Sequence, residues 1–231
     1  MSERFLITGA SRGIGRAIAN KLATPGRELL LHGRDQEALV EVFTEVETAG
    51  ARPSILLCDL TQPSEIEEMV QKMGSEPLHA LINNAGIAVV KPLGEIPLED
   101  WQSAVDVNIT APFLLTQKLA PLMPEGATIV NILSVAAKTG FPEWSSYSMC
   151  KFALEGFSQS VREELRPLGI RVVNVYPSAT ATEIWDDIEG RWPRDKMLPA
   201  EEVAEAVAYA LARPTSVLVE NISVGRQSGN L

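Results

Sequence analysis

The sequence predicts an α/β fold: one domain over residues 1–231, built on a doubly wound parallel sheet of about seven strands with helices on both faces. Short, almost wholly apolar runs alternate along the chain with longer amphipathic segments, the order that crossover helices between parallel strands require. The apolar runs lack a regular polar alternation, which indicates strands covered on both faces. We find no internal repeat, linker or low-complexity stretch that would divide the chain.

Each predicted strand is a short apolar run, and each predicted helix is a longer amphipathic segment. The strands are expected at 5–7, 29–31, 54–57, 80–82, 127–132, 171–175 and 216–224. The helices are expected at 14–22, 35–49, 64–73, 101–119, 147–165 and 199–212. The segment 178–198 has neither the periodicity of a strand nor that of a helix, and it is rich in tryptophan and charged residues. Loops of that length inside compact domains are usually functional, so we expect a substrate lid at about 178–199.

Composition argues against several classes of function. A net charge of −10 with 20 Lys+Arg argues against nucleic-acid binding and against an anionic membrane as partner. The two cysteines, Cys58 and Cys150, cannot form a disulfide framework and lack metal-ligand spacing, so we expect no metal. A strand-like run at 4–7 comes directly after the first residues, and no apolar run reaches membrane-spanning length. We therefore expect no signal peptide and a cytoplasmic location.

The first predicted strand is connected to the first predicted helix by a glycine-spaced turn, Thr8-Gly9-Ala10-Ser11-Arg12-Gly13-Ile14-Gly15. Glycine permits a tight turn and a close backbone approach, and the free N–H groups of a helix N-terminus bind a pyrophosphate. The turn therefore favours a dinucleotide site. The alternative is an ordinary strand-to-helix turn in which glycines recur for conformational reasons.

Tyr147 and Lys151 lie four residues apart and so share one face of a predicted helix. We expect the ammonium to lower the pKa of the phenol from about 10 towards neutrality, which would make Tyr147 an acid and a base. Ser134 ends the fifth predicted strand, where ligands bind in a doubly wound sheet, and can donate to a substrate carbonyl oxygen. Taken singly, the alternatives are a capping serine, a core or rim tyrosine and a solvated lysine.

The spacing Gly-x-x-x-Gly-x-Gly after Thr8 resembles the glycine motif of the short-chain dehydrogenase/reductase family, and the resemblance covers nearly the whole chain. Asn83-Asn84-Ala85-Gly86 and Asp59-Leu60 match two further motifs of that family. Pro177-Ser178 departs from the Pro-Gly that is usual there, whereas Thr182 fits the family's threonine near the nicotinamide.

The resemblance implies a Rossmann fold, NAD(P) as cofactor and a catalytic tetrad of Asn108, Ser134, Tyr147 and Lys151, in which Asn108 holds a water that relays protons. The cofactor-binding residues that it implies are Gly9, Ser11, Arg12, Gly13, Ile14, Gly15, Arg34, Asp59, Leu60, Asn84, Ala85, Gly86, Tyr147, Lys151, Pro177, Thr180 and Thr182. In the family, the helices at 101–119 and 147–165 pair with those of a second subunit. We therefore expect a homodimer or a homotetramer.

The end of the second predicted strand favours NADPH over NADH. NAD-selective sites place a carboxylate there to bind the ribose hydroxyl, but this chain has Gly33 followed by Arg34. Arg34 can grip a 2′-phosphate with its fork of donors, and Arg12 is a second cation placed for the same phosphate. The alternative is that Arg34 stacks on adenine and Arg12 points to water.

The substrate pocket is expected to be apolar, because aromatic residues gather on the segments around Tyr147. The candidate substrate residues are Val135, Ala136, Phe141, Trp144, Trp185 and Trp192. They favour an apolar or aromatic carbonyl substrate, and the alternative is a lid whose aromatic residues only pack on the domain. The tail through Asn230 lacks an Asp-Gly-Gly ending and looks like that of small carbonyl reductases similar to sepiapterin reductase.

These observations predict an NADPH-dependent oxidoreductase that reduces a carbonyl to an alcohol. A 3-oxoacyl-[acyl-carrier-protein] reductase is the alternative among enzymes, although that role usually needs a basic docking patch and this chain is acidic. A dinucleotide-binding sensor or scaffold without catalysis is the alternative outside enzymes. Such proteins often lack the tyrosine or the lysine, and both are present here.

Overall fold

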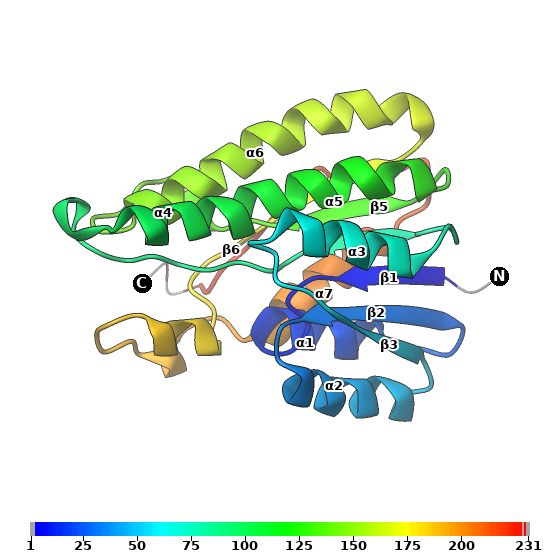
Figure 1. Ribbon diagram of the computed structural model, residues 1–231, viewed down its shortest axis with the longest axis horizontal. Helices are drawn as coiled ribbons and strands as arrows, with labels where there is room; N and C mark the ends of the chain where they lie inside the picture. Colours follow the sequence, from blue (N-terminus) through cyan, green and yellow to red (C-terminus); the bar gives the residue numbers. More distant parts are fainter. Residues whose placement is uncertain (1–2, 228, 230–231) are drawn as a thin grey trace.

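The strands form one parallel sheet in the computed structural model, which describes residues 3–227 and 229 (Figure 1). Within these residues the sheet has 7 strands in the order β3-β2-β1-β4-β5-β6-β7, and adjacent strands are parallel. The strands are β1 (Glu3–Ile7), β2 (Arg27–Gly33), β3 (Arg52–Leu57), β4 (Ala80–Asn83), β5 (Thr128–Ile132), β6 (Arg171–Pro177) and β7 (Asn221–Val224). The predicted fold class is confirmed. The chain order reverses between β1 and β4, so the ligand crevice of such a sheet lies at their carboxyl ends.

The helices form a layer on each face of the sheet (Figure 1). One layer holds α1 (Gly13–Leu22), α2 (Gln36–Thr48) and α7 (Ala200–Leu211), and the other holds α3 (Pro63–Met73), α4 (Leu98–Val105), α5 (Ala111–Leu119) and α6 (Ser145–Leu165). Neighbouring residues of one strand serve opposite layers, because Ile7 packs in the core cluster of α1 and α7 and Leu6 in that of α3 and α5. Since both faces are buried, the central strands are continuous apolar runs.

The helix predicted at 101–119 is interrupted in its middle. α4 and α5 are joined by a π-helical turn at Asp106–Thr110, where the N–H of Ala111 donates to the carbonyl of Asp106. Pro112 has no N–H and cannot bond to the carbonyl of Asn108, four residues earlier. The turn therefore widens at this point, and Asn108 lies within it.

β7 is shorter than predicted, beginning at Asn221 rather than at residue 216. The guanidinium of Arg171, on the adjoining β6, donates to the carbonyl of Val217 at 3.4 Å. The N–H of Val217 is bonded to the carbonyl of Pro214 at 2.8 Å, in a turn. Because these groups are bonded outside a sheet ladder, strand pairing starts only where Asn221 lies beside Asn174.

The segment 178–198 is a loop closed at its base. A parallel bridge joins Thr180 to Leu198, and the N–H of Ala181 donates to the carbonyl of Leu198 at 2.8 Å. Between these ends lie two short 3-10 turns, at Glu183–Asp187 and Arg194–Lys196. In Figure 1 the loop, in gold, projects beyond the carboxyl ends of the strands.

The described residues contain neither a membrane-spanning helix nor a candidate metal site. None of the helices there is both long and apolar enough to cross a membrane. The same part of the chain holds no group of three His, Cys, Asp or Glu residues that could bind a metal ion. Cys58 and Cys150 are free and buried, and burial raises their thiol pKa values to about 12 and about 11.

Candidate active site

Two adjoining cavities open at the carboxyl edge of the sheet. The first, of about 200 Å³, is lined by the glycine turn, the end of β2 and the segments that follow β3 and β4. The second, of about 210 Å³, is lined by the segment after β5, the start of α6 and the 178–198 loop. Ile14, Thr182 and Ile184 line both cavities, so a ligand that fills the first can extend into the second.

The glycine turn forms the floor of the first cavity. Gly9 and Gly13 adopt φ values of +65° and +54°, a region that other residues rarely enter. A Cβ on Gly9 would lie 3.0 Å from the Cα of Ala85, so the backbone passes too close to that segment for a side chain. α1 begins at Gly13 without a side-chain cap from Arg12 and without an acidic residue in its first turn. Its first N–H groups are therefore suited to an anion.

Gly15, which the resemblance assigns to the cofactor, does not line the first cavity. A Cβ there would lie 1.9 Å from the carbonyl oxygen of Gly9, and the residue is buried rather than exposed to the cavity. Gly15 is therefore needed for close packing of α1 on the turn. Ser11, Arg12, Gly13 and Ile14 do line the cavity.

Hydrogen bonds hold the glycine turn to the segment after β4. The hydroxyl of Thr8 accepts from the N–H groups of Asn84 at 2.9 Å and Ala85 at 3.0 Å. The side-chain amide of Asn84 donates to the carbonyls of Thr8 at 2.9 Å and Gly9 at 3.2 Å. Asn84, Ala85 and Gly86 thereby form a wall of the first cavity.

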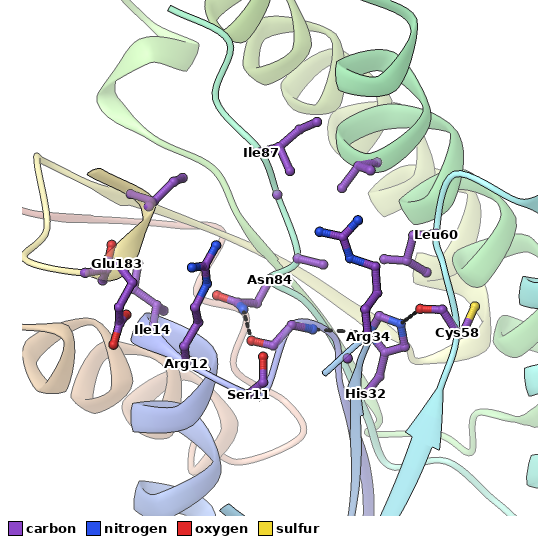
Figure 2. A pocket seen from close by; sticks show the side chains of 18 of the residues that line it. Ser11, Arg12, Ile14, His32, Arg34, Cys58, Leu60, Asn84, Ile87 and Glu183 are labelled. Atoms are coloured by element: carbon purple, nitrogen blue, oxygen red, sulfur yellow. Dashed lines mark hydrogen bonds between the residues drawn. The ribbon is translucent and has the colours of Figure 1, made fainter. Parts of the chain in front are cut away.

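Four charged residues line the first cavity: Arg12, Arg34, Asp59 and Glu183. Figure 2 shows the side chains of Arg12 and Arg34 extending in the same direction, with Ser11 between them. Arg34 is exposed at the end of β2, whereas Arg12 pairs with Asp187 of the 178–198 loop at 3.2 Å. The carboxylate of Asp59 accepts from the N–H and the hydroxyl of Thr61, both at 3.0 Å. The neighbouring Leu60 is buried against the same cavity.

The first cavity is also lined by residues that were not predicted from the sequence, namely His32, Cys58, Ile87, Val107, Glu183 and Ile184. The most polar buried one is His32, which is only 2 % exposed. Its Nδ1 accepts from the N–H of Gly9 at 3.2 Å, and its Nε2 is 3.1 Å from the carbonyl oxygen of Cys58 (Figure 2). Burial lowers the pKa of His32 to about 4, so the ring is neutral. A histidine at the end of an otherwise apolar strand was the available signal.

Ser134, Tyr147 and Lys151 come together at the second cavity. Ser134 follows β5, and Tyr147 lies in the first turn of α6; both line the cavity. Lys151, one turn further along α6, is 4 % exposed and lines neither cavity. Its Nζ donates to the carbonyl of Ile132 at 2.8 Å and lies 5.4 Å from the centroid of the Tyr147 ring.

The prediction of a lowered phenol pKa is wrong for this arrangement. Burial raises the pKa of Tyr147 to about 12, although a hydrogen bond with Ser134 opposes the rise. Burial also lowers the pKa of Lys151 to about 8. The ammonium is directed at the carbonyl of Ile132, so desolvation outweighs the attraction expected from a nearby cation. The phenol of Tyr147 thus keeps its proton at neutral pH.

Asn108 lies beside this group in the π-helical turn and is buried. Its side-chain oxygen accepts from the N–H of Ile87 at 3.2 Å, and its amide donates to the carbonyls of Ile87 at 3.0 Å and Ala104 at 2.9 Å. A Cβ on Gly86 would lie 2.8 Å from the Asn108 oxygen and 3.8 Å from the Lys151 nitrogen. Asn108 and Lys151 therefore both lie close to Gly86, which lines the first cavity.

All six candidate substrate residues line the second cavity, namely Val135, Ala136, Phe141, Trp144, Trp185 and Trp192. Pro177, Thr180 and Thr182, which the resemblance assigns to the cofactor, line it as well. Trp144 packs edge-on against Tyr147, with ring centroids 5.5 Å apart, and against Trp185 at 5.7 Å. The centroids of Trp185 and Trp192 are 4.8 Å apart. The three tryptophans form one aromatic wall next to the phenol.

Comparison with known proteins agrees with this geometry. The family model described as short chain dehydrogenase matches residues 3–191. The chain belongs to the short-chain dehydrogenase family. It is therefore an NAD(P)-dependent dehydrogenase or reductase, as the sequence predicted.

Three similar proteins of this family illustrate its range. Sepiapterin reductase from Chlorobaculum tepidum is 30 % identical, over 100 % of this chain and 99 % of that protein. A 3-oxoacyl-[acyl-carrier-protein] reductase from Synechocystis sp. is 30 % identical, over 93 % of this chain and 91 % of that protein. The solved structure of landomycin C-6 ketoreductase LanV, with bound NADP and rabelomycin, has a TM-score of 0.84 and 28 % identity, covering 96 % of this chain and 94 % of that one.

Proposed function

We propose that this short-chain dehydrogenase is an NADPH-dependent carbonyl reductase that acts on an apolar or aromatic carbonyl compound. One observation carries the proposal: Ser134 and Tyr147 line an apolar cavity that adjoins the anion-binding turn at α1. The similar 3-oxoacyl-[acyl-carrier-protein] reductase and the similar ketoreductase LanV support reduction of a carbonyl group as the reaction.

The residues of the first cavity fit a dinucleotide. The positive φ of Gly9 and Gly13 and the uncapped N-terminus of α1 suit a pyrophosphate that approaches the backbone closely. A Cβ on Gly86 would meet the oxygen of Asn108, so the wall beside the turn has no room for a side chain. Asp59 and Leu60 line the end of the cavity away from Tyr147, where the adenine would bind.

The choice of NADPH over NADH rests on the end of β2. Gly33 presents no carboxylate that would repel a 2′-phosphate, and the exposed guanidinium of Arg34 borders the cavity. Arg12 is the second cation at this site, although it also pairs with Asp187. An exposed pair of this kind contributes at most about 1 kcal/mol, so a phosphate can compete for Arg12.

Tyr147 is suited to donate a proton. NADPH bound in the first cavity would supply a hydride to the carbonyl carbon. The phenol of Tyr147, whose pKa is raised to about 12, remains protonated at neutral pH and can protonate the carbonyl oxygen. The hydroxyl of Ser134 donates a hydrogen bond to the same oxygen and stabilises its developing charge. Lys151 would bind the hydroxyls of the nicotinamide ribose, and Asn108 would hold the water that relays a proton to Lys151.

The aromatic wall supports an apolar substrate. Trp144, Trp185 and Trp192 all line the cavity. The indole N–H of Trp185 already donates to the carbonyl of Thr180 at 2.7 Å, and that of Trp192 to the carbonyl of Ile188 at 3.2 Å. Flat aromatic surfaces bind other aromatic rings in stacked or edge-on geometry. An aromatic ketone would therefore place its ring on this wall and its carbonyl near Tyr147.

The surroundings of the site complete the proposal. The 178–199 loop would be the substrate lid of a single NAD(P)-binding domain over 1–231; residues 1–2, 228 and 230–231, including the tail residue Asn230, lie outside the described residues. Two free, buried cysteines suit a reducing cytoplasm. Phe113 of α5 is 42 % exposed and Phe152 of α6 is 47 % exposed, which supports a homodimer through these helices or a homotetramer that contains it.

One assay tests the proposal. Oxidation of NADPH would be followed with aromatic diketones, simple ketones, pterin carbonyls and an acetoacetyl thioester as substrates. We expect the highest kcat/KM with an aromatic carbonyl, and a loss of about 10²- to 10⁴-fold in Tyr147→Phe. Tyr209→Phe, at an exposed position of α7, is the matched control. Preference for the thioester would indicate the acyl-carrier-protein reductase instead, and tight NADPH binding without turnover would indicate a sensor.

A further inference from the structure

His32 binds the glycine turn twice. Its backbone carbonyl accepts from the N–H of Ala10 at 2.8 Å, and its Nδ1 accepts from the N–H of the preceding Gly9 at 3.2 Å. Two consecutive amides of the turn are therefore fixed by one residue at the end of β2. His32 is among the residues that line the first cavity, and Figure 2 shows the hydrogen bonds of its ring there.

The same ring is also bonded to the segment after β3. Since Nδ1 accepts a hydrogen bond, the proton of the neutral ring lies on Nε2, which donates to the carbonyl of Cys58 at 3.1 Å. Cys58 directly precedes Asp59 and Leu60, which line the far end of the cavity. The imidazole thus connects the segments that border the two ends of the first cavity.

We propose that His32 is a positioning residue for the dinucleotide: through its bond to the N–H of Gly9 it sets the glycine turn for the pyrophosphate. The inference rests on the proposed function, because it takes the first cavity as the NADPH site. The Gly9 bond is the essential one, since without it the turn that receives the phosphates has an amide free to reorient.

The chain contains its own control for a merely structural histidine. His79 is the other of the two histidines, and its Nδ1 accepts from the N–H of Arg4 at 3.2 Å. Both rings therefore accept a backbone N–H of β1 or of the turn after it. Arg4 and His79 lie at the amino-terminal part of the sheet, away from the residues that line either cavity.

Two amide variants separate the bonds of His32. In His32→Asn the side-chain oxygen takes the place of Nδ1 and keeps an acceptor for Gly9. In His32→Gln the amide reaches the place of Nε2, keeps the donor to Cys58 and leaves the Gly9 N–H without its partner. For His32→Gln we expect the Kd and the KM for NADPH to rise about tenfold, with kcat at saturating NADPH unchanged. For His32→Asn and His79→Gln we expect a change of less than about twofold.

The measurements keep this inference distinct from the proposed function. The Kd comes from the fluorescence of NADPH on titration, independently of turnover. If the wild type does not bind NADPH, the proposed function fails; if the wild type binds and His32→Gln binds as well, only the role of His32 fails. Equal losses in His32→Asn and His32→Gln would also overturn the assignment to the Gly9 bond.

A spectroscopic measurement on the wild type tests the proposal even if the His32 variants do not fold. Imidazole ¹⁵N spectra should show the Nε2–H tautomer for His32, and its Nδ1 signal should move when NADP⁺ is added. The His79 signals, assigned with His79→Gln, should stay in place. A His32 ring whose nitrogen signals ignore the dinucleotide would contradict the proposal.

Discussion

Replacing Lys151 by methionine should abolish turnover and yet stabilise the fold at neutral pH. The Lys151 ammonium is almost fully buried, and burial lowers its pKa from 10.5 to about 8. Because a pKa difference of one corresponds to about 1.4 kcal/mol, burying this charge destabilises the folded state by roughly 3 kcal/mol at pH 7. Methionine fills similar space without a charge. It leaves the Ile132 carbonyl without the donor that Nζ provides, at a cost of about 1 kcal/mol.

The net gain for Lys151→Met is therefore about 2 kcal/mol at pH 7, or a rise in Tm of roughly 4–8 °C for a chain of this length. The gain should depend on pH with a definite sign. Between pH 8 and pH 10.5 the folded wild type has lost the proton that its unfolded chain keeps, so wild-type stability rises with pH. The advantage of the variant should shrink over this range and turn into a small deficit above it.

Urea unfolding followed by circular dichroism at pH 7 and pH 9.5 measures this difference. Protein concentration should be equal in all samples, because association contributes to apparent stability. Lys72→Met, on the exposed side of α3, is the matched control and should change stability little at either pH. A Lys151→Met variant that is less stable than the wild type at pH 7, with parallel pH curves, would refute the reasoning.

Three further predictions concern the cofactor, the substrate and the assembly. Arg34→Ala should raise the KM for NADPH about tenfold and leave that for NADH nearly unchanged, as expected when a charged hydrogen bond is lost. Gly33→Asp should shift the cofactor preference towards NADH after a small movement of Leu39, whose side chain lies 3.3 Å from the added Cβ. A wild type with a higher kcat/KM for NADH than for NADPH would contradict both expectations. Trp185→Ala should raise the KM for aromatic ketones about tenfold but spare small aliphatic ones, and equal effects on both would indicate a wall that only packs. Sedimentation equilibrium should show at least a dimer that Phe152→Glu dissociates, whereas a fully active wild type of monomer mass contradicts this.

The strand positions could be predicted because a strand that is buried on both faces appears in the sequence as a short, continuous apolar run. Leu6 and Ile7 face opposite layers and must both be apolar, whatever the rest of the chain does. The glycine turn was equally local, since Gly9 and Gly13 are required by the backbone path itself. The aromatic residues near Tyr147 were recognisable because their segments flank it at the same edge of the sheet.

What the sequence could not predict depends on contacts between distant segments. The spacing of Tyr147 and Lys151 is local, but their pKa values depend on how deeply the sheet and the π-helical turn bury them. The partners of His32 come from two other segments, the turn after β1 and the segment after β3. The late start of β7 depends on a guanidinium from β6. For His32 and for β7 the decisive atom belongs to a residue more than twenty positions away.

The closed base of the 178–198 loop bears on how this enzyme could change over time. Its two ends bond to each other through Thr180, Ala181 and Leu198. A different loop sequence between them therefore need not displace the two ends. We therefore expect that the loop can be exchanged, lengthened or shortened with little effect on β6 and α7, because loop insertion between fixed ends adds little free energy. If the proposed function holds, the sheet and the residues around Tyr147 would stay constant while changes in this loop alter the substrate preference, in evolution or by design.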